Sequence, residues 1–115
     1  MQITMLESKG VIGETDMLQT MQQDALRVAE KALDVFDVTD SIDIASFIKK
    51  EFDKVYGPGW QCIVGTNFGS FVTHCHGCFI HYCIGNLAIL LFRGLGGPEV
   101  AQADWFSGGL ETLKA

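Results

Sequence analysis

The sequence predicts an α+β domain in which two helices pack on an antiparallel β-sheet. Two segments in the first half of the chain, 17–37 and 41–56, carry apolar residues at helical spacing. The second half, 60–92, consists of β-rich runs interrupted by short Gly and Asn turns, a pattern typical of an antiparallel meander. One domain is expected, because a chain of 115 residues usually forms a single hydrophobic core.

The composition favours a folded, acidic protein and disfavours several classes of partner. The chain is 48% hydrophobic and 19% charged, with a net charge of −6. Its eight basic residues show no patch beyond Lys49 and Lys50, so we expect no binding to nucleic acid or to an anionic membrane. The longest apolar run, 87–92, is too short for a membrane span of about 20 residues, and the N-terminus shows no signal-peptide pattern. The four cysteines are therefore expected in a reducing compartment.

The N-terminal third is expected to form a strand and then a helix. Residues 1–8 are weakly patterned and expected to be flexible, whereas 9–13 is a short apolar strand. Thr15 and Asp16 are candidate N-caps, and Gln19 completes a partial capping box after Asp16. The buried face of the helix at 17–37 is expected to consist of Met21, Ala25, Val28, Ala32 and Phe36.

A second helix is expected to begin near Ser41 or Ile42 and to end before Gly57-Pro58-Gly59. Its predicted buried stripe follows steps of four, four and three: Ile44, Ile48, Phe52 and Val55.

Four strands are expected after this helix, at 60–66, 68–75, 79–84 and 87–92. The Gly85-Asn86 pair suits a tight hairpin turn between the last two. If strand 68–75 lies at an edge of the sheet, its free backbone donors and acceptors make it a docking site for another strand. Strands this apolar in so short a chain also suggest that a second subunit completes the core.

Four strings of the sequence are long enough to point to one protein family. They are MQQD at 21–24, IKKEFDK at 48–54, GPGWQCIVG at 57–65 and NFGSFVTH at 67–74. Together they resemble the hub-type dynein light chains, the small cytoplasmic dynein light chain family, over residues 9–94. The variations CHGC at 75–78 and FIHYC at 79–83 resemble the land-plant branch. The resemblance implies a flexible N-terminus at 1–8, a light chain domain at 9–94 and a flexible C-terminal tail at 95–115.

The resemblance implies a non-catalytic hub protein that forms a strand-swapped homodimer. Such a hub binds short linear motifs of disordered partners by β-strand addition and promotes dimerisation of those partners. Dynein intermediate chain is the family's partner where dynein exists. The expected location is the cytoplasm, in association with microtubules, the cytoskeleton and motor protein complexes.

The family's groove positions match a continuous segment of this chain together with residues on neighbouring elements. The expected peptide-binding residues are Asn67, Phe68, Gly69, Ser70, Phe71, Val72, Thr73, His74, His81, Cys83, Ala88, Ser41 and Ile42. The expected dimer-interface residues are Gln61, Ile63, Thr66, Phe68 and Lys49.

The sequence departs from the family pattern at positions that affect ligand choice and regulation. Two extra residues lie between the helices, and Ser41 and Ile42 replace an acidic and a basic residue at the helix start. His81 and Cys83 stand at positions that are usually aromatic, which predicts a smaller and more polar pocket. Gln61 stands where the family often has a histidine at the dimer interface, so acid-driven dissociation is expected to be weak. Gly94 replaces a serine that can be phosphorylated, so that switch is expected to be absent.

The C-terminal tail contains a candidate internal ligand. The run EVAQAD at 99–104 places Gln102 in a short, extendable segment after a glycine-rich stretch. A weak motif tethered in this way could compete for the groove, although a disordered extension is the simpler interpretation.

Two alternatives to the hub hypothesis stay open. The chain could be a dedicated structural subunit of one motor or pore assembly. It could also be a zinc or redox protein that uses Cys75 and Cys78, a C-x-x-C flanked by His74 and His76. The second alternative is disfavoured because these residues are expected in one hairpin, with strand alternation dividing them between two faces. No catalytic residue, metal site or cofactor is expected, because no nucleophile has an oriented base and no phosphate-type glycine motif is present.

Overall fold

The computed structural model of the chain describes residues 10–95. Its elements, in chain order, are β1 (Gly10–Thr15), α2 (Gln19–Val35), α3 (Ser41–Tyr56), β2 (Trp60–Gly65), β3 (His74–Ile84) and β4 (Leu87–Gly94). The expectations for the N-terminus at 1–8 and for the tail around Gln102 lie outside these residues.

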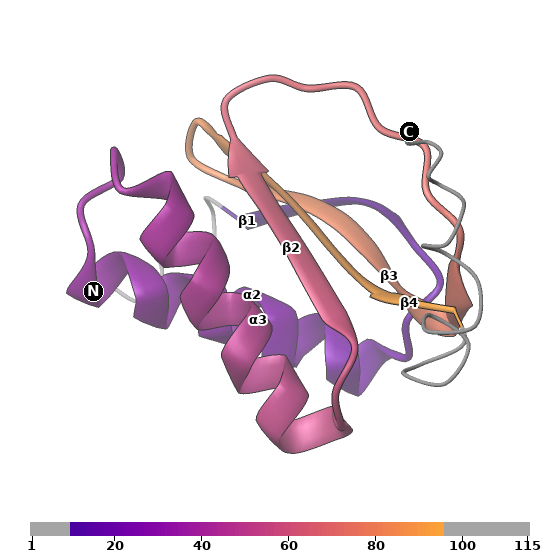
Figure 1. Ribbon diagram of the computed structural model, residues 1–115. Coiled ribbons are helices and arrows are strands. Elements are labelled where there is room, and N and C mark those ends of the chain that lie inside the picture. Colours follow the sequence, from indigo (N-terminus) through magenta and orange to yellow (C-terminus); the bar gives the residue numbers. More distant parts are fainter. Residues whose placement is uncertain (1–9, 96–115) are drawn as a thin grey trace, which may run out of the picture.

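The four strands form one antiparallel sheet in the order β1-β3-β4-β2. Helices α2 and α3 lie together on one face of this sheet, as Figure 1 shows. The predicted α+β class with two helices on an antiparallel sheet is therefore confirmed. Strands β1 and β2 are the two edges, so each pairs with one strand only among the described residues.

The core lies between the helices and one face of the sheet. Alternate residues of β3 and β4 point into it, including Ile80, Tyr82, Ile89 and Leu91, all fully buried. From the helices come the buried residues Ala25, Ala29, Ala32, Ile44, Ile48 and Phe52. The three alanines let α2 approach the sheet closely, while each larger side chain contributes roughly 1.5–3 kcal/mol by burial. Within the described part of the chain, no helix is both long and apolar enough to cross a membrane.

The start of α2 differs from the predicted capping box. The N-cap residue is Leu18, without a side-chain cap, and the helix begins at Gln19. Thr15 Oγ1 instead donates to the Phe79 carbonyl at 2.7 Å and accepts from the Met17 N–H at 3.0 Å. The Asp16 carboxylate accepts from the N–H groups of Gly77 and Phe79 at 2.8 and 3.1 Å. Both predicted caps therefore attach the end of β1 to β3, a long-range contact that local sequence does not reveal.

The predicted stripe of α3 is right for three residues and wrong for the fourth. Val55 is 64% exposed. The stripe continues instead at Tyr56, whose ring lies 5.0 Å from that of Phe52. The step is therefore four residues throughout, and the helix ends at Tyr56, before Gly57 with φ 95°.

The predicted strand at 68–75 and the predicted hairpin at 75–78 are wrong for the single chain. Strand β3 begins at His74 and runs through CHGC, and 66–73 is a connecting segment without strand structure. The register moves from His74 opposite Gly94 to Phe79 opposite Phe92, so residues 75–78 form a bulge. Gly77 takes φ 78° there, which a residue with a side chain adopts only with strain. The Gly85-Asn86 turn is confirmed, with φ 59° at Gly85.

Candidate functional site

The face of the sheet that lies opposite the helices carries five of the predicted site residues, Gln61, Ile63, His81, Cys83 and Ala88. We call it the outer face, and its members alternate with the core residues along each strand. They are Phe79, His81 and Cys83 of β3, Ala88, Leu90 and Phe92 of β4, and Gln61 and Ile63 of β2. Leu90 is fully buried although it points away from the helical core. The outer face therefore holds apolar surface as well as polar side chains.

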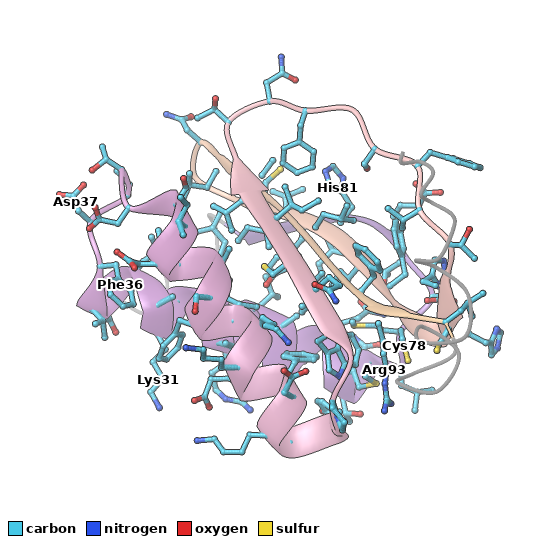
Figure 2. The ribbon with its side chains drawn as sticks, in the orientation of Figure 1. Lys31, Phe36, Asp37, Cys78, His81 and Arg93 are labelled. Atoms are coloured by element: carbon cyan, nitrogen blue, oxygen red, sulfur yellow. The ribbon has the colours of Figure 1, made fainter. Side chains whose placement is uncertain are left out.

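The segment 66–73 connects β2 to β3 and arches away from the sheet between them, as Figure 1 shows. Among the described residues, this segment forms no backbone hydrogen bond. Phe71 is fully exposed, whereas Phe68 turns inward and meets His81 edge-to-face with ring centroids 5.8 Å apart. Figure 2 shows the His81 ring directed from β3 toward this segment. One aromatic contact thus anchors a segment whose backbone has no hydrogen-bond partner within residues 10–95.

A cavity of about 480 Å³ lies between this segment, the end of β1 and β3. Its lining residues are Glu14, Thr15, Asp16, Phe68, Ser70, Phe71, Val72, His74, Phe79 and His81. The rings of His74 and Phe79 stack against each other in this wall, 4.7 Å apart and 22° from parallel. Glu14 and Asp16 are the charged groups of the lining, and Asp16 is held in place by the two backbone N–H groups of β3. The cavity, called the groove below, combines aromatic walls with an acidic end.

The structure brings about half of the predicted peptide-binding residues to the groove. Phe68, Ser70, Phe71, Val72, His74 and His81 line it. Asn67, Gly69 and Thr73 lie on the same segment, and Cys83 and Ala88 face each other further along the sheet. Ser41 and Ile42 lie outside the groove, at the start of α3, and Ile42 is 82% exposed. The groove of one protomer is therefore not closed by the helix start.

The lining also includes four residues that the sequence did not single out for this role. Thr15 and Asp16 had been assigned to a helix cap, and Glu14 to no site. Phe79 could have been found, because it alternates with His81 along a predicted strand and therefore shares its face.

The predicted dimer-interface residues fall into two groups. Gln61 and Ile63 are exposed on the outer face of the edge strand β2, and Thr66 is exposed just beyond its end. Phe68 lies in the groove, as described above. Lys49 lies instead on α3, where its Nζ binds Asp53 Oδ2 at 2.5 Å.

Asp53 itself belongs to the core edge rather than to the site. Burial favours a higher pKa for this carboxyl, but the Lys49 ammonium and the Trp60 N–H together hold the pKa below its ordinary value. Asp53, which pairs with Lys49 on the same helix, therefore holds the start of β2 against α3 by accepting from the Trp60 N–H.

The four cysteines are all reduced and half-buried in the structure. Burial raises the pKa of the Cys62 thiol to about 12, so this thiol stays protonated in the core. Cys75 and Cys78 lie in the bulge of β3. Within residues 10–95, no three His, Cys, Asp or Glu side chains converge in a way that could hold a metal ion.

Comparison with known proteins gives one family and a consistent fold. A family model described as "Dynein light chain type 1" matches residues 9–94. The dynein light chain-like domain of the calcium binding protein FhCaBP2 from Fasciola hepatica, in a mercury-derivative crystal, superposes with a TM-score of 0.65 at 20% identity. That match covers 77% of this chain and 95% of the other. A native crystal of the same domain gives 0.60 at 24% identity, covering 73% and 89%. The DLC-like domain of CsTAL3 gives 0.59 at 17% identity, covering 74% and 92%. At these identities the structural likeness shows the fold alone.

Proposed function

Because the chain belongs to the dynein light chain family, whose model spans residues 9–94, we propose that it is a dimeric hub that binds extended peptide segments by strand addition. Members of this family are in general non-catalytic adaptors that dimerise and bind partner peptides. The proposal rests on two stretches of backbone whose N–H and C=O groups lack hydrogen-bond partners. Within residues 10–95, the segment 66–73 has no backbone hydrogen-bond partner, and the outer edge of β2 has none either.

In the proposed dimer, these two stretches of backbone form hydrogen bonds with each other across the interface. In a two-fold arrangement, segment 66–73 of one protomer lies along β2 of its partner, and the reverse pairing occurs at the other end. The sheet order then extends from β1-β3-β4-β2 by one strand. Gln61, Ile63 and Thr66, all exposed in the single chain, would be covered in this arrangement. The two outer faces would also come together, which gives their apolar residues a partner layer.

The peptide would occupy the edge that remains free. Once segment 66–73 pairs with the partner's β2, its second edge still offers backbone donors and acceptors. The ligand main chain supplies a grip that does not depend on sequence, and selectivity comes from side chains beneath alternate ligand residues. Phe68, Ser70, His74 and His81 are the residues of the groove best placed for that selection.

The helix start would form the opposite wall of the groove in the dimer. Ser41 and Ile42 lie at the beginning of α3, where Ser41 is half-buried and Ile42 is exposed, so both side chains could contact a ligand or the partner's segment. Because Ile42 is apolar, this wall contributes a hydrophobic contact rather than an ion pair. Cys83 and Ala88 would line the floor between the two walls.

The partners expected on this proposal are disordered proteins that expose short extendable segments. Dynein intermediate chain, in a cytoplasmic motor complex on microtubules, is the partner that family membership favours. Gln102 of the chain's own tail is a further ligand candidate. Calcium binding belongs to the name of the Fasciola protein. Within residues 10–95 of this chain, no three Asp, Glu, His or Cys side chains come together in a way that could hold a metal ion.

Capture of partners by the full chain tests the proposal. The variant Ser70→Pro removes one backbone N–H from the segment, whereas Ser70→Ala removes the hydroxyl and keeps the N–H. Partners pulled down from a cell extract are identified by mass spectrometry, and their segments are then titrated as synthetic peptides. We expect the wild type and Ser70→Ala to bind several unrelated segments and Ser70→Pro to lose them. Identical binding by all three proteins would contradict strand addition, and a single captured partner would indicate a dedicated subunit.

A further inference from the structure

The bulge of β3 places two cysteines between two residues of the groove wall. Residues 75–78, here called the CHGC bulge, lie between His74 and Phe79. On the opposing strand β4, Arg93 alone lies between their pairing partners Gly94 and Phe92. In a regular strand, Cys75 and Cys78 would point to opposite faces, because side chains alternate. The bulge and the positive φ of Gly77 (78°) remove that separation.

Each of the two thiols lies beside one of two consecutive residues of β4, Gly94 for Cys75 and Arg93 for Cys78. Cys75 Sγ donates to the Gly94 carbonyl at 3.2 Å. Cys78 packs against the edge of the core, and Figure 2 shows it beside Arg93. Burial raises the pKa of Cys78, a negative charge on Cys75 raises it further, and Arg93 partly offsets both effects. Because Gly94 and Arg93 are consecutive, the two thiols lie at the same end of β4.

The residues at both ends of the CHGC bulge line the groove. His74 and Phe79 lie at its two ends, stack on each other and both line the groove. The Asp16 carboxylate, also in the lining, binds the N–H groups of Gly77 and Phe79. A change in the path of the bulge therefore moves three groove residues together.

We propose that Cys75 and Cys78 are a modification site at which a reversible intramolecular disulfide reshapes the groove. The effect on ligands rests on the proposed peptide-binding function, whereas formation of the disulfide does not. Joining the two sulfurs shortens the bulge, which pulls His74 relative to Phe79 and separates their stacked rings.

The oxidant is a low-molecular-weight disulfide of the glutathione type. The Cys75 thiolate attacks this disulfide, so that a bond forms between Cys75 and one half of it and the other half leaves as a thiolate. The Cys78 thiolate then attacks Cys75 Sγ, and the second half leaves. Two protein thiols and one small disulfide become one protein disulfide and two small thiols, which take up the two protons. Cys78 acts second because burial raises its pKa and so disfavours its thiolate. Since the thiolate is the attacking form of each cysteine, the reaction is faster at mildly alkaline pH.

Oxidation of the full chain by oxidised glutathione tests the site. After an acid quench, remaining thiols are alkylated under denaturing conditions, and intact and peptide masses are measured. We expect a loss of two hydrogens, a bond mapped to Cys75 and Cys78, and free thiols at Cys62 and Cys83. Cys75→Ser and Cys78→Ser should each prevent it. The matched control is His76→Ser, an exposed substitution within the same bulge that keeps both thiols.

The effect on the groove is measured by titrating one captured peptide against the reduced and oxidised protein. We expect affinity about fivefold or more weaker after oxidation, the lower end of typical coupling between sites, with recovery on reduction. Hydrogen exchange at residues 74–79, measured without peptide, should change on oxidation of the wild type and stay constant in Cys75→Ser. Mixed adducts without an intramolecular bond would overturn the proposal, as would a disulfide that changes neither exchange nor affinity. If no peptide binds the reduced protein, the hub function fails, and the exchange data still decide whether the disulfide reshapes the groove.

Discussion

At the scale of single residues, the Asp24 side chain links helix α2 to helix α3. The Tyr56 hydroxyl on α3 donates to one oxygen of Asp24 on α2, and Arg27 pairs with the other. The Tyr56 hydrogen bond, and then the Arg27 hydrogen bond and charge, lower the pKa of Asp24. For Tyr56, burial and the neighbouring carboxylate raise the pKa to about 12. The pair is therefore ionised at Asp24 and neutral at Tyr56 across the physiological range.

The substitution Asp24→Asn should destabilise the fold in a pH-dependent way. A carboxyl whose pKa is lowered by folding stabilises the protein above its unfolded pKa, and this stabilisation is lost as the pH falls through the folded value. We expect the free energy of unfolding to fall by about 1 kcal/mol at neutral pH, and the difference from wild type to shrink below about pH 4. Urea unfolding at pH 7 and pH 3 measures both effects. Asp34→Asn, on an exposed position of the same helix, is the control and should change neither value.

Residue-level predictions succeeded where a local period governs burial. The four-residue step identified Ile44, Ile48 and Phe52, because one helix face meets the sheet. The capping assignment of Thr15 and Asp16 failed, because both side chains bond to the distant backbone of β3. The Asp16 carboxylate accepts from the N–H groups of Gly77 and Phe79, and Thr15 Oγ1 donates to the Phe79 carbonyl. A side chain suited to a cap is equally suited to any unsatisfied N–H, and only the tertiary structure decides between them.

At the scale of elements, the bulge of β3 depends on one backbone conformation. Gly77 has φ 78°, and a Cβ added there would meet no atom closer than 3.9 Å. The cost of Gly77→Ala is therefore conformational strain rather than a clash. We expect destabilisation of about 1 kcal/mol, measured by thermal or urea unfolding. The matched control is Gly69→Ala, whose Cβ has open space and whose φ is not positive, and which should leave stability unchanged. Equal stability of both variants would show that the bulge tolerates another backbone path.

The sequence predicted the helices and most strands because each is specified by its own periodicity. It did not predict the bulge, since CHGC contains a glycine and alternating polar residues that suit a turn equally well. It also assigned a strand to 68–75, of which only His74 and Cys75 belong to a strand, the start of β3. Phe68, Phe71 and Val72 have high strand propensity, but strand structure also requires a neighbouring strand, and residues 66–73 pair with no strand among the described residues.

At the scale of the whole molecule, the proposed dimer should persist under mild acid. Its interface would contain Gln61, which has no proton to gain between pH 7.5 and 5.5. We expect sedimentation at micromolar concentration to show mostly dimer at both pH values. Gln61→His provides the comparison, because an imidazole at this position would be charged at the lower pH and should promote dissociation. A wild-type protein that dissociates steeply over the same range would contradict this account, and His74, His76 and His81 would then be substituted in turn.

Only the part of the candidate site that lies on one continuous stretch of sequence could be predicted. Residues 67–74 were assigned together, and Phe68, Ser70, Val72 and His74 do line a common groove. Ser41 and Ile42 could not be placed with them in one protomer, because the helix start and the segment are distant elements of the same chain. In the proposed dimer, a second copy would bring the two walls together.

Hydrogen exchange at the backbone amides of residues 66–73 is the most direct test of strand exchange between protomers and of strand addition by a peptide. The full chain is followed at protein concentrations well below and well above dimer formation, and again with a captured peptide in excess. We expect fast exchange of these amides in the dilute protein. Pairing with the partner's β2 should protect alternate amides in the dimer, and an added peptide should protect the remaining ones. Fast exchange of the whole segment at every concentration, with or without peptide, would contradict both strand exchange and strand addition.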